Sequence, residues 1–233
     1  MRHYFVLNGV PSTDYGVYLA TANMMDAPER DYSEVTIPGR SGTLLHDNGR
    51  WSNGTLTVTA YIHDGIREKA QAFRTFLLSL PGYVRYEDTL RPEEYRMVRV
   101  SGGFEISTSD RIGGSFNITF SCKPYRYVKE GEEPITLMQS GIIHSDWIAH
   151  AKPLLRVYGW GTLQVGTGSL TIASDIGEYV DIDCEIKDAY MGENNRNSFV
   201  TVQEWPELIC GDNAIVLPST VTKIEITPRW VTL

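Results

Sequence analysis

The densest group of acidic side chains in the sequence lies between Val180 and Ile186. Asp181, Asp183 and Glu185 alternate there with apolar residues, so on a strand the three carboxylates would share one face. Such carboxylates could bind Ca²⁺, or could hydrolyse glycosides as a pair across a cleft. Calcium would need further oxygen ligands from other segments, and a glycosidase pair normally comes from two different strands. We therefore favour a solvated strand face, opposite cationic groups on a neighbouring strand.

Other reactive residues lack the spacing that their chemistry requires. The five histidines show no HxH or HExxH pattern, so a metal centre is not expected. A hydrolase nucleophile elbow around Ser41 would need its second glycine two residues later, where the sequence has Thr43. The three cysteines are odd in number and have no CxxC spacing, which predicts buried thiols without a disulfide or zinc site. We therefore expect no catalytic residue, no cofactor and no metal.

Aromatic residues in the second half offer a competing chemistry. Tyr158, Trp160, Tyr190 and Trp205 could stack on sugar rings, as the aromatic residues of carbohydrate-binding modules do. Tyr158 and Trp160 flank the expected end of a strand, however, and Pro206 fixes the loop after Trp205. We favour core or interface positions for these side chains.

Composition and charge divide the chain. Its 233 residues suffice for one large domain or two small ones, and 42% hydrophobic residues with 21% charged residues is ordinary for a globular protein. We find neither a membrane-spanning apolar run nor a signal-peptide pattern, so we expect synthesis in a cytoplasm and no membrane insertion. Residues 1–128 carry 14 basic and 14 acidic side chains, whereas residues 129–233 carry 7 and 15. This balance argues against nucleic-acid binding by the second half and indicates a boundary near residue 130.

The segment from Val35 to Thr57 reads as a protruding β-arm. Pro38-Gly39 breaks regular structure, and Asp47-Asn48-Gly49 is a second turn signal. From Thr55 a long alternating strand returns. Such a hairpin is marginal in water by itself and needs a surface to lie against, in its own domain or in a neighbouring subunit.

The rest of the first half predicts an α+β domain. Asp64 can cap an amphipathic helix of about four turns, which Pro81-Gly82 ends. Alternating or apolar runs predict the strands around it. These are Phe5–Leu7, Val17–Leu19, Thr55–Ile62, Tyr83–Tyr86, Tyr95–Val100, Phe104–Ile106 and Ser115–Cys122.

The second half predicts a linker followed by a β-sandwich. Residues 130–134 are charged and contain breakers, and His144 and His150 are expected to be polar surface near this linker. No helical pattern of useful length follows. Short strands separated by Gly- and Asn-rich turns suit a sandwich. They are Leu154–Tyr158, Ser169–Ala173, Tyr179–Ile186, Phe199–Val202, Ala214–Leu217 and Thr222–Thr227.

The ordered motifs resemble a known family. Ile37-Pro38-Gly39-Arg40-Ser41-Gly42 followed by Asp47-Asn48-Gly49-Arg50 is similar to the IPGRxG…DNGR signature of siphophage distal tail proteins. The opening and closing segments also resemble that family, so the likeness spans nearly the whole chain. The segments concerned are Phe5–Gly9, Asp14–Val17, Pro206–Leu208, Gly211–Asn213 and Ile226–Arg229.

The resemblance implies a mainly β, two-domain fold. Residues 1–130 would form a barrel-like α+β ring domain with one helix and the arm at residues 35–57. Residues 131–233 would form the linker and a galectin-like β-sandwich. The implied function is a hexameric ring at the distal end of a long non-contractile phage tail, without enzymatic activity. The ring would join the tail-tube protein to the baseplate or to the tail-associated fibre or lysin protein.

The resemblance also implies partners and locations. The sandwich could carry a receptor-binding protein, and the chain would reside in the virion after assembly in the host cytoplasm. The arm would contact the neighbouring subunit, with glycines serving its backbone and Arg40 and Arg50 bonding across the joint. The expected interface residues are Ile37, Pro38, Gly39, Arg40, Gly42, Asp47, Asn48, Gly49 and Arg50. Two alternatives stay open, a monomeric carbohydrate-binding β-sandwich module and a tail-tube subunit.

Overall fold

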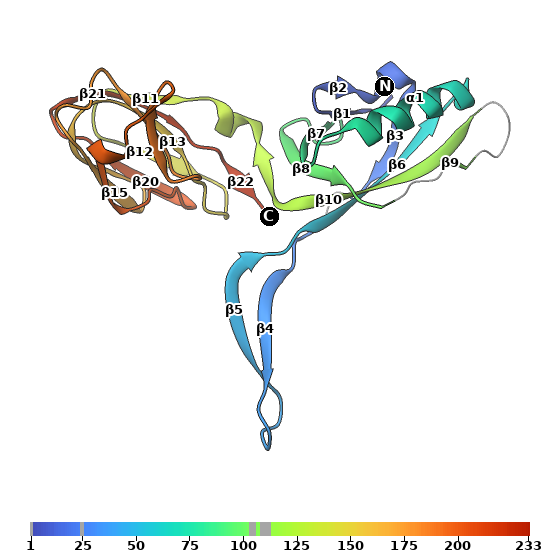
Figure 1. Cartoon of the computed structure of the whole chain (residues 1–233), viewed down its shortest axis with the longest axis horizontal. Coiled ribbons are helices and arrows are strands. Elements are labelled where there is room, and N and C mark those ends of the chain that lie inside the picture. Colours follow the sequence, from blue (N-terminus) through green and yellow to red (C-terminus); the bar gives the residue numbers. More distant parts are fainter. Residues whose placement is uncertain (1, 24–25, 103–105, 108–112) are drawn as a thin grey trace. The chain divides into compact units, whose positions relative to one another are not determined.

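The computed structural model describes residues 2–23, 26–102, 106–107 and 113–233 (Figure 1). The chain divides into two compact units: unit 1 comprises Met1–Arg126 with Leu233, and unit 2 comprises Tyr127–Thr232. The fold is mainly β, as the sequence predicts, and α1 (Ile66–Ser79) is the only α-helix in the described ranges.

Unit 1 is built on one antiparallel sheet with the strand order β2-β1-β7-β8-β10-β6-β3. In the described part of the chain, this strand order runs open from β2 to β3, and only an isolated bridge between His3 and Leu19 links β3 to the segment before β1. The barrel-like form expected from the resemblance is therefore not closed by strand pairing. Of the strand expected at Phe104–Ile106, residues 104 and 105 lie outside the described residues. The strands are β1 (Phe5–Leu7), β2 (Val10–Pro11), β3 (Val17–Ala22), β6 (Gly54–Ile62), β7 (Val84–Asp88), β8 (Glu94–Val100), β9 (Ile106–Ser107) and β10 (Gly114–Val128).

One face of this sheet is buried beneath α1. The apolar alternation in β6 and β10 places every second residue against the helix, where Phe73 and Leu77 are fully buried. The opposite face of the sheet carries mostly polar side chains. The expected helix cap is wrong, because Gly65 occupies the N-cap position and Asp64 instead forms an ion pair with Lys69.

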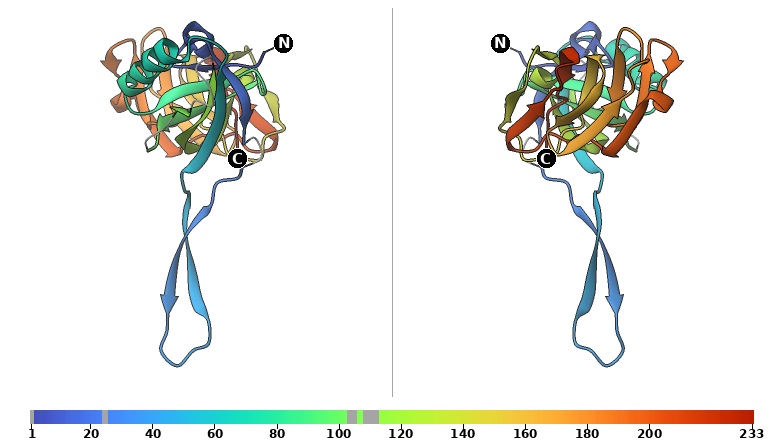
Figure 2. Two further views of the ribbon diagram at one scale, coloured as in Figure 1. Left: turned by 90° about the vertical axis from the view of Figure 1, so that its right-hand side faces the viewer. Right: turned by 90° about the vertical axis from the view of Figure 1, so that its left-hand side faces the viewer.

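The arm is a separate two-stranded sheet formed by β4 (Arg30–Thr36) and β5 (Thr43–Trp51). Figures 1 and 2 show this ribbon extending away from the sheet of unit 1. The sequence placed the returning strand at Thr55, whereas the chain already returns at Thr43. The strand from Gly54 belongs to the body, where it pairs with β10 and β3. The arm is therefore Arg30–Trp51.

Unit 2 is a sandwich of two antiparallel sheets, with orders β11-β21-β13-β16-β17-β18 and β12-β20-β14-β15-β19. Their inward side chains share one apolar core. The first sheet comprises β11 (Ile135–Leu137), β13 (Leu154–Gly159), β16 (Val180–Asp183), β17 (Asp188–Met191), β18 (Asn194–Asn195) and β21 (Val221–Thr227). The second comprises β12 (Gly141–Ser145), β14 (Gly161–Val165), β15 (Gly168–Ile172), β19 (Val200–Glu204) and β20 (Gly211–Val216), and the short β22 (Val231–Thr232) follows β21.

The segment expected to be a linker is ordered within unit 2. Lys129–Glu132 forms a 3-10 turn whose Gly131 is buried. The backbone N–H of Arg229 donates to Gly131 O at 2.7 Å, and the N–H of Val128 donates to Trp230 O at 2.9 Å. The first and last segments of unit 2 are therefore fastened together.

The two histidines placed near the linker also belong to unit 2. His144 Nδ1 lies 2.7 Å from Asp212, and His150 Nδ1 lies 2.9 Å from Glu207. The hydrogen bond with Asp212 raises the pKa of His144. Both rings are exposed, so their position as polar surface agrees with the sequence prediction.

The acidic row of β16 is not a solvated strand face, so that prediction is wrong. Asp181 is 4% and Asp183 is 7% exposed, because arginines cover both carboxylates. Arg156 donates two hydrogen bonds to Asp181, at 2.6 and 2.9 Å, and Arg229 donates two to Asp183, both at 2.8 Å. Glu185 lies beyond the strand, exposed and 3.7 Å from Arg229. The expectation of opposing cations was correct.

The backbone hydrogen bonds that join Val128 to Trp230 and Gly131 to Arg229 form a strap between the two ends of unit 2. This strap predicts where an independent fragment can begin. We expect residues 127–233 to fold alone into a β-rich, acidic domain. A fragment beginning at Pro134 loses the bonds of Val128 and Gly131 and should unfold at lower temperature. Circular dichroism during thermal unfolding of both fragments checks this. Equal melting temperatures would show that the strap contributes nothing.

The buried ion pairs of β16 predict a pH-dependent contribution to stability. Burial opposes ionisation of Asp183, but the hydrogen bonds and charge of Arg229 outweigh it and lower the pKa of that carboxyl. Its contribution is therefore present above the unfolded-state pKa near 4 and is lost as pH falls through the lower folded-state value.

Replacing Asp183 by Asn should lower the free energy of unfolding at pH 7 by about 1–3 kcal/mol, because the partly buried Arg229 keeps no ionised partner of equal geometry. The variant should also lose less stability than the native chain between about pH 5 and pH 2. Urea unfolding at several pH values measures both effects. The exposed Glu185→Gln serves as the control, with an expected change below about 1 kcal/mol, and equal losses in the two variants would contradict the assignment.

Candidate functional site: the arm and its root

The tip of the arm is a tight turn at Ile37–Arg40. The backbone N–H of Arg40 donates to Ile37 O at 3.1 Å, with Pro38 and Gly39 at the two central positions. Gly39 has a φ of 80°, which a type II turn requires at its third residue and which glycine adopts without strain. The Arg40 side chain is exposed at this tip and forms no ion pair with any residue that the structure describes.

The sequence indicated a second reverse turn at Asp47-Asn48-Gly49. In the structure these residues instead form a β-bulge inside β5. Tyr32 opposes Asp47 and Arg30 opposes Trp51, so Asp31 alone faces three residues of the other strand. Gly49 has a φ of 72°, and its N–H donates to Asp47 Oδ1 at 2.8 Å. The local turn chemistry is therefore present, but it bends a strand without reversing the chain.

Polar bonds across the bulge join the two strands. Arg30 donates from Nε and Nη2 to Asp47 at 2.9–3.1 Å, and Arg50 donates to Asp31 at 2.5 Å. Asn48 also donates to Asp31, at 3.1 Å. Hydrogen bonds from Arg50 and Asn48 lower the pKa of Asp31, and those from Arg30 lower the pKa of Asp47. Asp47, Asn48 and Arg50, which the sequence assigned to the subunit joint, thus bond within the arm.

Large apolar side chains remain uncovered on the arm. The cross-strand register places Val35 with Leu44 on one face of the ribbon, and Tyr32 with Leu45 on the other. These four side chains are 46–54% exposed, and Ile37 at the tip is 39% exposed. Both faces of the ribbon therefore present apolar surface to solvent.

The root of the arm is held by Asp26, in the segment between β3 and β4. Arg96 of β8 donates to both carboxylate oxygens of Asp26, at 2.7 and 2.9 Å. Arg126 of β10 donates to one of these oxygens at 2.9 Å and to the backbone carbonyl of Asp26 at 2.7 Å. Arg126 is only 7% exposed, so its charge is compensated at a buried position. The two arginines fasten the start of the arm to the sheet.

Electrostatic interactions keep the carboxylate of Asp26, the anchor of the arm, ionised. Burial opposes ionisation of Asp26, but hydrogen bonding and attraction by Arg96, with attraction by Arg126, lower the pKa of the carboxyl overall. Burial and the neighbouring Arg96 and Arg91 lower the pKa of Arg126. The Asp26 carboxylate therefore compensates several closely spaced cations.

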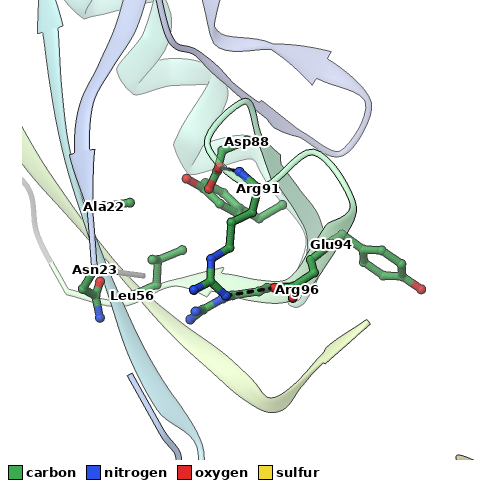
Figure 3. Close-up of a pocket in the computed structure, with 9 residues that line it drawn as sticks. Ala22, Asn23, Leu56, Asp88, Arg91, Glu94 and Arg96 are labelled. Atoms are coloured by element: carbon green, nitrogen blue, oxygen red, sulfur yellow. Dashed lines mark hydrogen bonds and ion pairs between the residues drawn. The ribbon is translucent and has the colours of Figure 1, made fainter. Parts of the chain in front are cut away.

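A small polar cleft lies beside the anchor (Figure 3). Arg91 reaches Glu94 at 3.2 Å, and Asp88 accepts the backbone N–H of Arg91 at 2.9 Å. Tyr86 lines the cleft with a buried hydroxyl that has no hydrogen-bond partner among the described residues, and burial with the nearby Asp88 raises its pKa. The described lining of the cleft has two arginines and two carboxylates, and within it we find no nucleophile paired with a base.

The other candidate residues do not assemble into a reactive site. In the described ranges no group of three or more His, Cys, Asp or Glu side chains could hold a metal ion. Trp205 packs against the core of unit 2, in agreement with the sequence prediction, whereas Trp160 is 45% exposed. Tyr158 lies beneath Lys223, whose Nζ is 4.1 Å from the ring centroid. No helix in the described residues is long and apolar enough to cross a membrane.

The anchor predicts a specific cost for losing one charge. Asp26→Asn should lower the free energy of unfolding of unit 1 by about 1–3 kcal/mol, because it leaves Arg126 buried without a carboxylate. Asp64→Asn removes a surface ion pair with Lys69 and should change it by less than about 1 kcal/mol. Urea unfolding of the full chain, followed by tryptophan fluorescence, compares the two variants. If Asp26→Asn and Asp64→Asn lower the free energy of unfolding equally, Asp26 does not stabilise unit 1 as an anchor.

Comparison with known proteins finds a solved structure with a similar architecture. No protein-family model matches the sequence, and no curated protein matches it. Among solved structures, the chain is similar to the SPP1 Dit protein, described as a paradigm of the hub adsorption apparatus in phages that infect Gram-positive bacteria. The likeness has a TM-score of 0.76 at 14% sequence identity and covers 97% of this chain and 98% of the other. The chain therefore has the fold of the phage hub protein Dit.

Proposed function

We propose that this chain is a structural virion protein that forms a hexameric ring at the distal end of a long non-contractile phage tail. The ring joins the tail-tube protein to the baseplate or to the tail-associated fibre or lysin protein. The likeness to SPP1 Dit supports this proposal, because it spans 97% of this chain and 98% of a protein described as part of a hub. A shared domain alone would not give such coverage of both chains.

The exposed arm supports self-assembly. An isolated two-stranded ribbon is marginal in water, and this ribbon leaves apolar residues uncovered on both faces. Contact with a neighbouring subunit would bury them and stabilise the arm. In this role Gly39, Gly42 and Gly49 supply the positive φ angles that the backbone of the arm requires. The side chains of Asp47, Asn48 and Arg50 stiffen the ribbon. Ile37, Pro38 and Arg40 form the contacting tip.

Unit 2 is the proposed attachment domain. It holds the acidic excess of the chain, and a receptor-binding or other tail protein would attach to it. Such partners are structural, so the chain acts without catalysis or cofactor. The host cytoplasm is the site of assembly, and the completed virion is the final location.

The two alternative functions have less support. A monomeric sugar-binding module needs a platform of aromatic rings, but Trp160 is exposed alone, while Tyr158 lies beneath Lys223 and Trp205 lies against the core. A tail-tube subunit has no need of a second sandwich unit. Neither alternative requires a long ribbon with uncovered apolar residues.

The solution mass of the full chain tests the proposal. Each chain has a mass of 26.2 kDa, so a closed ring should give a particle of about six chains by light scattering and a ring in electron micrographs. A monomer at all concentrations up to about 1 mM, a value chosen to exceed typical weak protein affinities, would exclude a self-assembling hub.

The arm predicts a second outcome. Replacing Asp31–Arg50 by Asn-Gly closes a short hairpin at the Arg30–Trp51 pair and should leave both units folded while abolishing the ring. Ser41→Ala at the exposed tip is the control and should assemble normally. Light scattering and circular dichroism measure assembly and folding separately. Intact rings in the shortened chain would contradict assembly through the arm.

A further inference from the structure

A row of polar and basic side chains crosses the open face of the unit 1 sheet. Val84 pairs with Val98, which places Tyr83 beside Arg99. The bond from Ser101 N to Thr119 O places Arg99 beside Ser121, and Lys123 follows on the same face. We call Asn53, Tyr83, Arg99, Ser121 and Lys123 the basic row.

Hydrogen bonds and cation–π contacts hold the basic row together. Asn53 Nδ2 lies 2.6 Å from the Tyr83 hydroxyl and 3.5 Å from Ser121 Oγ. Arg99 Cζ is 6.0 Å and Lys123 Nζ is 5.8 Å from the Tyr83 ring centroid. Burial opposes ionisation of Tyr83, but hydrogen bonding by Ser121, Arg99 and Asn53 lowers its pKa overall, in accord with positive local charge.

Among the residues that the structure describes, the two cations of the basic row have no carboxylate partner. Arg99 and Lys123 are both exposed, and neither forms an ion pair with any residue that the structure describes. Two cations beside an aromatic ring and an amide suit a carboxylate, which can accept hydrogen bonds from both.

The arm carries a matching acid. Three basic and three acidic residues lie between Arg30 and Trp51, and the Arg30–Asp47 and Asp31–Arg50 pairs satisfy four of them. Glu34 and Arg40 are left without ion pairs in the described part of the chain. The register places Glu34 on the same ribbon face as Tyr32 and Leu45, which are 47% and 54% exposed. We call this the Glu34 face.

The Glu34 face cannot reach the basic row of its own chain while the arm keeps its form. Glu34 lies four residue steps along β4 from Arg30, which pairs with Trp51 at the root of the arm. At roughly 3.3 Å per residue, Glu34 lies about 13 Å out along the arm. Asn53 of the basic row lies at the root, and Figures 1 and 2 show the arm leading away from its own sheet. The partner must be another molecule.

We propose that the Glu34 face of one copy docks on the basic row of a second copy, with the Glu34 carboxylate between Arg99 and Lys123. This interface rests on the proposed function and specifies its subunit contact. Tyr32 and Leu45 exclude water around the carboxylate, and Tyr83 supplies an apolar surface beneath the two cations. The contact joins two different surfaces of identical chains, and such a contact closes into a ring when the rotation between neighbours divides a full turn.

Charge reversal tests the interface on both sides. Glu34→Arg alone, and Arg99→Glu with Lys123→Glu, should each weaken assembly at least about tenfold in concentration, because like charges then meet at a desolvated contact. Combining all three substitutions should restore assembly. Glu68→Lys on the exposed side of α1 is the matched control and should assemble normally. Normal assembly of either reversed variant, or no rescue in the triple variant, would overturn the pairing.

Cross-linking gives a readout that does not require a complete ring. In a Cys210→Ser background, which removes the exposed thiol, one protein carries Glu34→Cys and another carries Lys123→Cys. An oxidised mixture should give disulfide dimers between the two proteins, at least about tenfold more than Glu34→Cys mixed with Arg67→Cys, in line with an effective-concentration gain. Dimers formed only between identical arms, or none above the control, would reject the interface.

The proposed ring and the proposed pairing of the Glu34 face with the basic row can be disproved separately. If replacement of Asp31–Arg50 abolishes the ring while both charge-reversed sets assemble, the arm contacts a neighbour through other residues and only this pairing is wrong. If the native chain never assembles and no cross-link forms, both the ring and the pairing are wrong.

Discussion

A two-stranded ribbon cannot bury its own side chains, and the form of unit 1 follows from that constraint. Each residue of the arm has solvent on at least one side, so hydrophobic burial cannot keep the ribbon straight. Cross-strand polar bonds replace it: Arg30 with Asp47, and Arg50 and Asn48 with Asp31. These bonds hold the strands together but do not orient the ribbon. Orientation depends on the root, where Asp26 is bound to two strands of the sheet.

The same chemical solution recurs in unit 2. Asp26 and Asp183 are each bound by arginines from segments far away in sequence, and each fixes a place where the chain enters or leaves a sheet. Asp26 holds the entry to the arm. Arg229, bound to Asp183, also donates its backbone N–H to Gly131 and so closes the strap between the ends of unit 2. Buried ion pairs here contribute position more than stability, since a well-packed apolar contact could stabilise as much.

Local patterns predicted the parts of the fold that depend on local physics. Strict alternation from Leu56 to Ile62 identified β6, and the apolar stripe from Ile66 to Leu77 identified α1. The Asp47-Asn48-Gly49 signal was chemically right, since Gly49 adopts positive φ, but a turn and a bulge use the same residues. Only the pairing partner distinguishes them, and that information is not local.

The root and the basic row were beyond prediction for the same reason. Arg96 and Arg126 are 70 and 100 residues from Asp26, and no spacing rule connects them. The alternation of β16 likewise correctly placed Asp181 and Asp183 on one face. It could not show that Arg156 and Arg229 would cover that face. Sequence therefore gives faces and periods, whereas burial of a charge depends on contacts between distant segments.

The ribbon's two outer edges have a consequence for the unassembled chain. Strands β4 and β5 pair only with each other in the described part of the chain, so each presents unpaired backbone N–H and C=O groups along its length. Such edges can template strand-by-strand polymerisation, which would compete with productive assembly at high expression levels. The bulge at Gly49 interrupts one edge, and Pro38 lies at the tip, where it cannot donate a hydrogen bond. The features that shape the arm for a partner therefore also protect it from indiscriminate amyloid-like growth before that partner arrives.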